Sequence, residues 1–155
     1  MSFRKRPPNY LITGAQTLTQ AQRDGIRRLQ GYRCYSDNTG SVASSGTATV
    51  NTVFQYACKI YGVSCATRLS ASATAAIGGL DGFEIAFSRQ TGDTLNTEAT
   101  IGSALFDRET GMWWLGQEWE FMAGEAIQSA WTNLQGASAL YAYVDFHVIE
   151  IQGAV

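Results

Sequence analysis

The single histidine of the chain, His147, would be the centre of any zinc site or catalytic triad. It follows Asp145 by two residues in an alternating segment, so both side chains are expected on one face of a strand, where they can touch. One histidine supplies neither a histidine pair for zinc nor an HExxH helix, and the sequence places no nucleophile beside it. Two interpretations stay open: a catalytic pair, and a polar strand residue at a sheet surface or subunit contact. The second is the simpler, and we assign no catalytic residue.

Two carboxylates, Glu118 and Glu120, alternate with Trp119 and Phe121. Paired carboxylates beside aromatic residues are typical of glycosidase clefts, and they can also bind calcium. The same alternation is expected where a solvated strand face lies opposite an apolar core face, and no DxDxDG loop accompanies the pair. We favour the solvated face, and we expect no metal and no cofactor.

Four tryptophans, at positions 113, 114, 119 and 131, are candidates for stacking against sugars or bases. Because Trp113 and Trp114 are adjacent, they point to opposite faces of a regular strand, and one of them faces outward. The other interpretation is burial in the core and in a subunit interface, and both stay open. The candidate ligand or subunit contacts are Trp113, Trp114, Glu118, Glu120 and His147.

The charge of the chain is strongly divided along its length. Residues 1–33 hold seven bases and one acid, a net charge of +6, whereas the remaining residues hold four bases and twelve acids, a net charge of −8. Such a block is typical of an interaction tail. It suits phosphate contacts or an acidic protein groove, and a solvated tail without a partner is the third interpretation. The bases assigned to anchoring or anion binding are Arg4, Lys5, Arg6, Arg23, Arg27, Arg28 and Arg33.

The elements that carry these residues can be outlined from turn and capping signals. Residues 1–16 contain two prolines and are expected to be extended. A short helix is expected from Thr19, which can cap it, with Gly31 at its end. Ser36–Thr49 is rich in Gly, Ser, Thr and Asn and is expected to be a linker. The chain therefore divides into a basic arm, helix and linker at 1–46 and a β-sandwich domain at 47–155.

Beyond the linker, apolar and polar residues alternate with a period of two in short segments separated by turn residues. A hairpin is expected around the loop Asp107–Gly111, with Leu105 and Phe106 in its first strand. Leu140–Ile151 is the longest strand, with Ala142, Val144, Phe146 and Val148 on one face. The segments lie at 54–60, 69–74, 83–88, 105–106, 112–115, 119–121, 127–131 and 140–151. They predict an all-β fold, an antiparallel β-sandwich of the jelly-roll kind.

Three cysteines, at positions 34, 58 and 65, are expected to be free thiols buried like small apolar residues. On one continuous strand Cys58 and Cys65 would lie roughly 20 Å apart and on opposite faces. A disulfide between them would require Gly62 to turn the chain.

Charged residues make up only 15% of the chain, below the usual quarter. Much of the surface must therefore be polar and uncharged, or be covered by other subunits, and we expect a homo-oligomer. The long uncharged stretches are laced with Ser, Thr, Asn and Gln, so no membrane span is expected. The N-terminal charges precede no apolar segment, so a secretory signal is not expected and synthesis in a cytoplasm is the simplest account.

The organisation of the chain carries a resemblance. A basic, proline-containing arm leads into a Gly/Ser linker and Ser/Thr/Ala-rich strands, then into Trp119–Ile127 and the closing strand Ala142–Ile151. From about Val53 to Ile151 this resembles small jelly-roll virion proteins of viruses and phages, of the coat, cement or decoration, and fibre-tip types. The resemblance implies symmetric homo-oligomers in the virion, made in the host cytoplasm and docked on other capsid or virion proteins by the arm. Because the body is acidic, nucleic acid is expected to contact the arm only.

Two functions from different classes follow. The first is a virion structural protein, a capsid-associated cement or decoration protein or a coat subunit, which is not an enzyme. The alternative is a carbohydrate- or receptor-binding fibre-tip module that uses exposed tryptophans with Glu118, Glu120 or Asp145.

Overall fold

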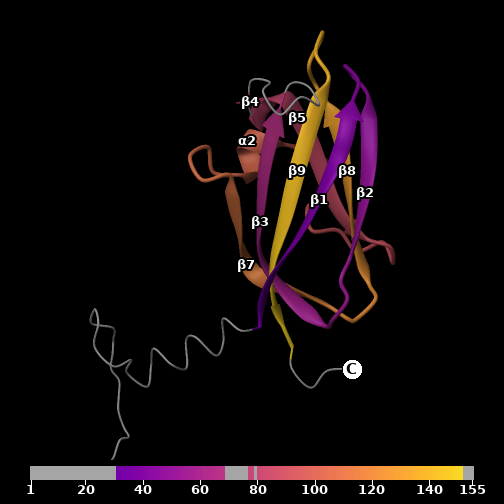
Figure 1. Ribbon diagram of the computed structural model, residues 1–155, viewed down its shortest axis with the longest axis vertical. Helices are drawn as coiled ribbons and strands as arrows, with labels where there is room; N and C mark the ends of the chain where they lie inside the picture. The colour runs from indigo at the N-terminus through magenta and orange to yellow at the C-terminus, as the bar shows by residue number, and fades with distance from the viewer. Residues whose placement is uncertain (1–30, 69–76, 79, 152–155) are drawn as a thin grey trace, which may run out of the picture.

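The computed structural model describes residues 31–68, 77–78 and 80–151 (Figure 1). Their elements, in chain order, are β1 (Tyr32–Val42), β2 (Thr47–Val53), β3 (Cys58–Arg68), β4 (Ile77–Gly78), the 3-10 turn η1 (Leu80–Gly82), β5 (Phe83–Arg89), β6 (Thr100–Ile101), the single-turn helix α2 (Gly102–Leu105), β7 (Met112–Phe121), β8 (Ala126–Asn133) and β9 (Leu140–Glu150).

The strands form two antiparallel sheets that pack face to face. One sheet has the order β1-β9-β3, and both β7 and the short β4 pair with the far edge of β3. The other sheet has the order β2-β8-β5-β6. An all-β antiparallel sandwich, as the sequence predicts, is thereby confirmed.

The strand pairs are nested along the chain. β1 pairs with β9, β2 with β8, β3 with β7 and β5 with β6, so the chain behaves as one long hairpin whose two arms pair from the ends to the tip. The pairs β3–β9 and β5–β8 then join the nested pairs into two sheets. Rolling a long hairpin up in this way gives the jelly-roll topology.

The core lies between the sheets and is built from the inward positions of each strand. On β9 the inward face is Ala142, Val144, Phe146 and Val148, all fully buried, as the alternation predicts. The largest side chains that fill the core are Phe54, Phe83, Phe87, Phe121, Trp131 and Phe146. Burying side chains of this size is the main term that stabilises the sandwich.

The expectation of a linker over Ser36–Thr49 is wrong, because β1 occupies residues up to Val42 and β2 starts at Thr47. β1 pairs with β9 along its length, so the sandwich begins at Tyr32 and includes part of the range 1–46. The turn signal around Gly40 is realised as an irregularity in this pairing, where Gly40 has a φ of 66° and the Thr39 hydroxyl accepts a hydrogen bond from the Ala142 amide. A polar strand forms here because its partner supplies backbone hydrogen bonds regardless of side-chain polarity.

Other element boundaries also differ from the expectation. The strand expected at 54–60 begins only at Cys58, since the backbone of Phe54 instead bonds to Gly124 and Glu125 in the β7–β8 turn. The expected first strand of the hairpin at Leu105–Phe106 is wrong, because Leu105 ends helix α2. The loop that follows does close on itself, with Asp107 accepting hydrogen bonds from the amides of Glu109 and Thr110. The strand expected at 69–74 and the helix expected from Thr19 lie outside the described residues.

Candidate functional site

The outer face of the β1-β9-β3-β7 sheet brings together several of the residues that the sequence singles out. Asp145 and His147 both point outward from β9, as predicted from their spacing. In the sheet register His147 lies between Cys34 on β1 and Gly62 on β3. Residues that the sequence analysis missed, Tyr32 and Ser64, therefore flank the histidine on the two neighbouring strands.

Both ring nitrogens of His147 are hydrogen-bonded. Nδ1 lies 2.8 Å from the Tyr32 hydroxyl, and Nε2 lies 2.9 Å from the Ser64 hydroxyl. Burial lowers the pKa of His147, while the nearby Asp145 carboxylate acts in the opposite direction. A neutral imidazole donates through one nitrogen and accepts through the other, and both hydroxyls can serve either role. The ring thus ties β1, β9 and β3 together across the outer face.

A serine bonded to a histidine nitrogen is also the geometry of an activated nucleophile, so an acyl-transfer site must be considered. Ser64, however, lies in the middle of β3, which is paired on both sides, with Asp145 on β9 and Met112 on β7 opposite it. The following amide, of Cys65, donates to the Gly111 carbonyl. Amides near Ser64 are therefore committed to the sheet instead of being free to hold an oxyanion. The geometry favours a structural role for this trio.

A bulge at Tyr61 shapes the centre of this face. Ile60 pairs with Val148 and Gly62 with His147, so Tyr61 has no partner on β9. On the other side Ile60 pairs with Trp119 and Gly62 with Trp114, which leaves residues 115–118 of β7 opposite Tyr61 alone. Bulges redirect side chains and recur beside functional sites.

The same bulge overturns the expectation for the cysteines. Cys58 and Cys65 both face the core, because the extra residue shifts the alternation of β3 by one position between them. All three cysteines are free, as expected, but Cys34 is exposed on the outer face, so the expectation that it is buried is wrong. Burial raises the pKa of Cys58 to about 12, which makes it a weakly reactive thiol.

Trp113 and Trp114 point to opposite faces of β7, as predicted. Trp113 packs inward against Phe87 and Phe106. Trp114 is 63% exposed on the outer face, where its ring is nearly parallel to that of Tyr61, at 13° and 6.0 Å between centroids. Tyr61 in turn lies 6.2 Å from Tyr32. We call Tyr32, Tyr61 and Trp114 the aromatic strip.

Glu118 and Glu120 point outward while Trp119 and Phe121 pack toward the core, which confirms the expected alternation. Glu118 forms a loose ion pair with Lys59, at 3.8 Å, and Glu120 lies opposite Lys59 in the register. Within the described part of the chain, no group of three His, Cys, Asp or Glu side chains is placed to hold a metal ion.

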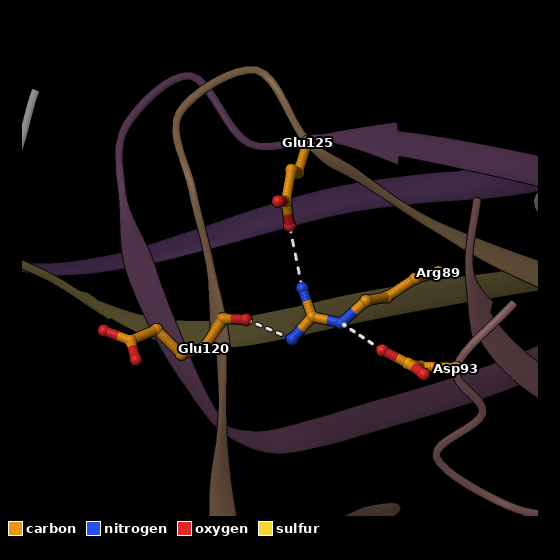
Figure 2. A network of polar contacts seen from close by, with 4 residues as sticks. All are labelled: Arg89, Asp93, Glu120 and Glu125. Carbon is orange, nitrogen blue, oxygen red and sulfur yellow. Dashed lines mark hydrogen bonds and ion pairs between the residues drawn. The ribbon is translucent and has the colours of Figure 1, made fainter. Parts of the chain in front are cut away.

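The strongest polar cluster surrounds Arg89, which the sequence analysis did not single out (Figure 2). Its guanidinium pairs with Glu125 at 2.7 Å and Asp93 at 3.9 Å, and it donates to the Glu120 carbonyl. The same group stacks on the rings of Phe121 and Trp119, at 4.1 and 4.9 Å from their centroids. Carboxylates, a backbone carbonyl and two aromatic rings of this chain thus contact the cation. It joins β5 to the β7–β8 turn and is a structural clamp between the sheets.

Of the bases assigned to anchoring, only Arg33 lies among the described residues. It belongs to β1, pairs with Glu150 on β9 and lies 5.5 Å from the ring of Tyr56. Arg4, Lys5, Arg6, Arg23, Arg27 and Arg28 lie outside the described residues. Where residues 31–151 are described, no helix is long and apolar enough to cross a membrane.

Comparison with protein families, curated proteins and solved structures finds no match for this chain.

One end of the sandwich carries exposed apolar side chains beside charged ones such as Arg33 and Glu125. Val53, Tyr56 and Met122 are each at least half exposed there, and we call them the end patch. The Phe54 backbone bonds to Gly124 and Glu125, which holds the loop carrying Tyr56 against the turn carrying Met122. β1 begins and β9 ends at this same end, since Tyr32 pairs with Ile149 (Figure 1).

Proposed function

We propose that this chain is a virion structural protein, a capsid-associated cement or decoration protein or a coat subunit. It assembles with copies of itself through the β-sandwich and is anchored to other virion proteins by its basic N-terminal arm. The observation that carries the proposal is that β1, into which the arm leads, begins at the same end of the jelly roll as the end patch.

The end patch gives the molecule an anchoring end. Three exposed apolar side chains lie at this end, two from the end of β2 and the β2–β3 loop and one from the β7–β8 turn. Exposed apolar residues that lie close together are typical of interaction surfaces. The chain enters β1 at this end, so residues 1–30 connect to the sandwich beside the patch. A partner surface bound by the arm would therefore also cover the patch.

Electrostatics favours an acidic partner for the arm. Residues 1–33 carry +6 and the remainder −8, so copies of the body repel one another unless the arm of one copy or a partner compensates. An acidic groove on a neighbouring copy or on another virion protein fits the arm best, and nucleic acid remains a partner for the arm alone.

The virion role is proposed by analogy with the segment order of virion proteins, and the fold alone does not establish it. Jelly rolls occur in capsid proteins and also in lectins, so the fold alone does not distinguish these functions. The order of a basic arm followed by a single jelly roll is what favours the structural role.

The anchoring role of the arm can be tested by removing its positive charges. A variant with Gln at positions 4, 5, 6, 23, 27 and 28 should fold normally but enter purified particles at least tenfold less efficiently. A control that exchanges Arg for Lys and Lys for Arg at the same positions keeps the charge and should enter particles normally. Equal incorporation of the Gln variant and wild type would refute the anchoring role.

A second function, carbohydrate or receptor binding at a fibre tip, is favoured by one observation. Trp114 is the most exposed large apolar side chain described, and it lies beside hydrogen-bonding groups on a sheet face. A soluble receptor or saccharide that protects Trp114 from solvent would support this function.

A further inference from the structure

We infer that the aromatic strip is a binding site for an uncharged saccharide, with the sugar ring stacked on Trp114. The inference rests on the second function proposed above, and it is independent of anchoring by the arm.

The position of Trp114 is built into the sheet. A Cβ atom placed on Gly62 would lie 3.2 and 3.3 Å from two atoms of the six-membered ring of Trp114, so the ring lies directly against the backbone of β3. Tyr61, projected by the bulge, lies nearly parallel beside it. The indole is thus supported from beneath and from one side, while 63% of the residue stays exposed. A rigid exposed aromatic surface binds the C–H face of a sugar with little loss of side-chain entropy.

Polar groups from β1, β3 and β9 lie on the same sheet face as the strip. The hydroxyls of Tyr32 and Ser64 each bond to a nitrogen of His147, and each hydroxyl oxygen has further hydrogen-bonding capacity. Their positions are fixed by the imidazole between them, so a ligand meets oriented hydroxyls without having to order them. Sugar hydroxyls are matched donors and acceptors for such groups, whereas a purely apolar ligand would leave them unpaired.

The charges of this face select against an anionic ligand. Asp145, Glu118 and Glu120 point outward from the same sheet. Two bases also point outward from β3: Lys59, whose amine is shared with Glu118, and Arg68, which lies six residues along the strand from Gly62. The carboxylates therefore outnumber the bases on this face. A nucleotide or a sulfated sugar would bring phosphate or sulfate toward these carboxylates, which repel it. A ligand that stacks on an indole, forms hydrogen bonds through hydroxyl groups and carries no anionic group is a neutral saccharide.

The test uses affinity electrophoresis of the full-length protein in native gels that contain dextran, galactomannan or mixed-linkage β-glucan, with polygalacturonate as the anionic probe. At least one neutral polysaccharide should retard the wild type, and polygalacturonate should retard it less. Trp114→Ala should weaken that binding at least tenfold, and Gly62→Ala, which displaces the ring without removing it, should weaken it several-fold. Tyr56→Ala removes another exposed aromatic ring, in the end patch, and should bind as wild type.

Each result of the gel experiment bears on a different part of the proposal. If no neutral polysaccharide retards the wild type, the saccharide site is refuted, whereas receptor binding within the second function still stands. Retardation that persists undiminished in folded Trp114→Ala refutes this site but keeps the binding function. Stronger retardation by polygalacturonate refutes the uncharged class. Particle incorporation of Trp114→Ala should equal that of wild type, because anchoring uses the arm and the end patch.

Discussion

The ring of Trp114 lies directly over Gly62, its register partner on β3. A Cβ atom at position 62 would lie 3.2 Å from Trp114 Cε3 and 3.1 Å from Met112 Cε, so these side chains must move to admit it. Gly62→Ala should therefore leave the fold intact, lower the free energy of unfolding by about 1 kcal/mol and increase the solvent contact of Trp114.

Acrylamide quenching of tryptophan fluorescence measures this change. Gly62→Ala should be quenched more strongly than wild type, and the difference should vanish when both proteins also carry Trp114→Phe. A difference that survives in the Trp114→Phe background would show that another tryptophan had moved.

The strand β1 should be required for folding of the sandwich. It covers the edge of β9 over Tyr32–Val42 and contributes Val42, only 3% exposed, to the buried apolar residues. A fragment of residues 31–155 should show a cooperative thermal transition by circular dichroism. A fragment of residues 47–155 leaves β9 with an unpaired edge and should show none. Equal melting temperatures for the two fragments would mean that β1 is dispensable.

The Arg89 clamp should be a substantial source of stability. Arg89→Leu keeps an apolar stem but removes the hydrogen bonds to Glu125 and to the Glu120 carbonyl, and we expect a loss of about 1 to 3 kcal/mol. Chemical denaturation measures it. Arg108→Gln breaks the exposed pair with Asp81 and should leave the denaturation midpoint unchanged. Equal midpoints for Arg89→Leu and wild type would show that the clamp is energetically neutral.

His147 should make stability depend on pH below neutrality. Its pKa in the folded protein is lowered, mainly by burial, from the ordinary 6.5. Above pH 6.5 the ring is neutral in both states and its contribution to stability is complete. As the pH falls through 6.5 toward the folded pKa, the unfolded state takes up the proton first and this contribution is lost.

Melting temperatures of wild type and His147→Gln between pH 8 and pH 5 isolate this effect, because carboxylates titrate in both proteins. The wild type should lose more stability on acidification than the variant. Parallel profiles would show that His147 titrates alike in the folded and unfolded states.

Alternation was sufficient to predict the sandwich, the common face of Asp145 and His147, and the opposite faces of Trp113 and Trp114, since a period of two fixes which residues share a face. It failed for β1, because residues such as Asn38 and Gly40 occupy a strand whose hydrogen bonds come from β9. The bulge at Tyr61 depends on the register of three strands, so neither the Tyr32–His147–Ser64 trio nor the common face of Cys58 and Cys65 could be read from spacing.

We propose that the chain assembles with copies of itself through the end patch of its sandwich and through its basic arm. The most direct measurement is the molar mass of the purified full-length protein by light scattering, beside the six-site Gln variant and a variant with Ser at positions 53, 56 and 122. The account predicts a multiple of 16.8 kDa for the full-length protein, and a shift toward the monomer for both variants and at high salt. A full-length protein that stays monomeric at high concentration, or an oligomer that neither variant weakens, would contradict it.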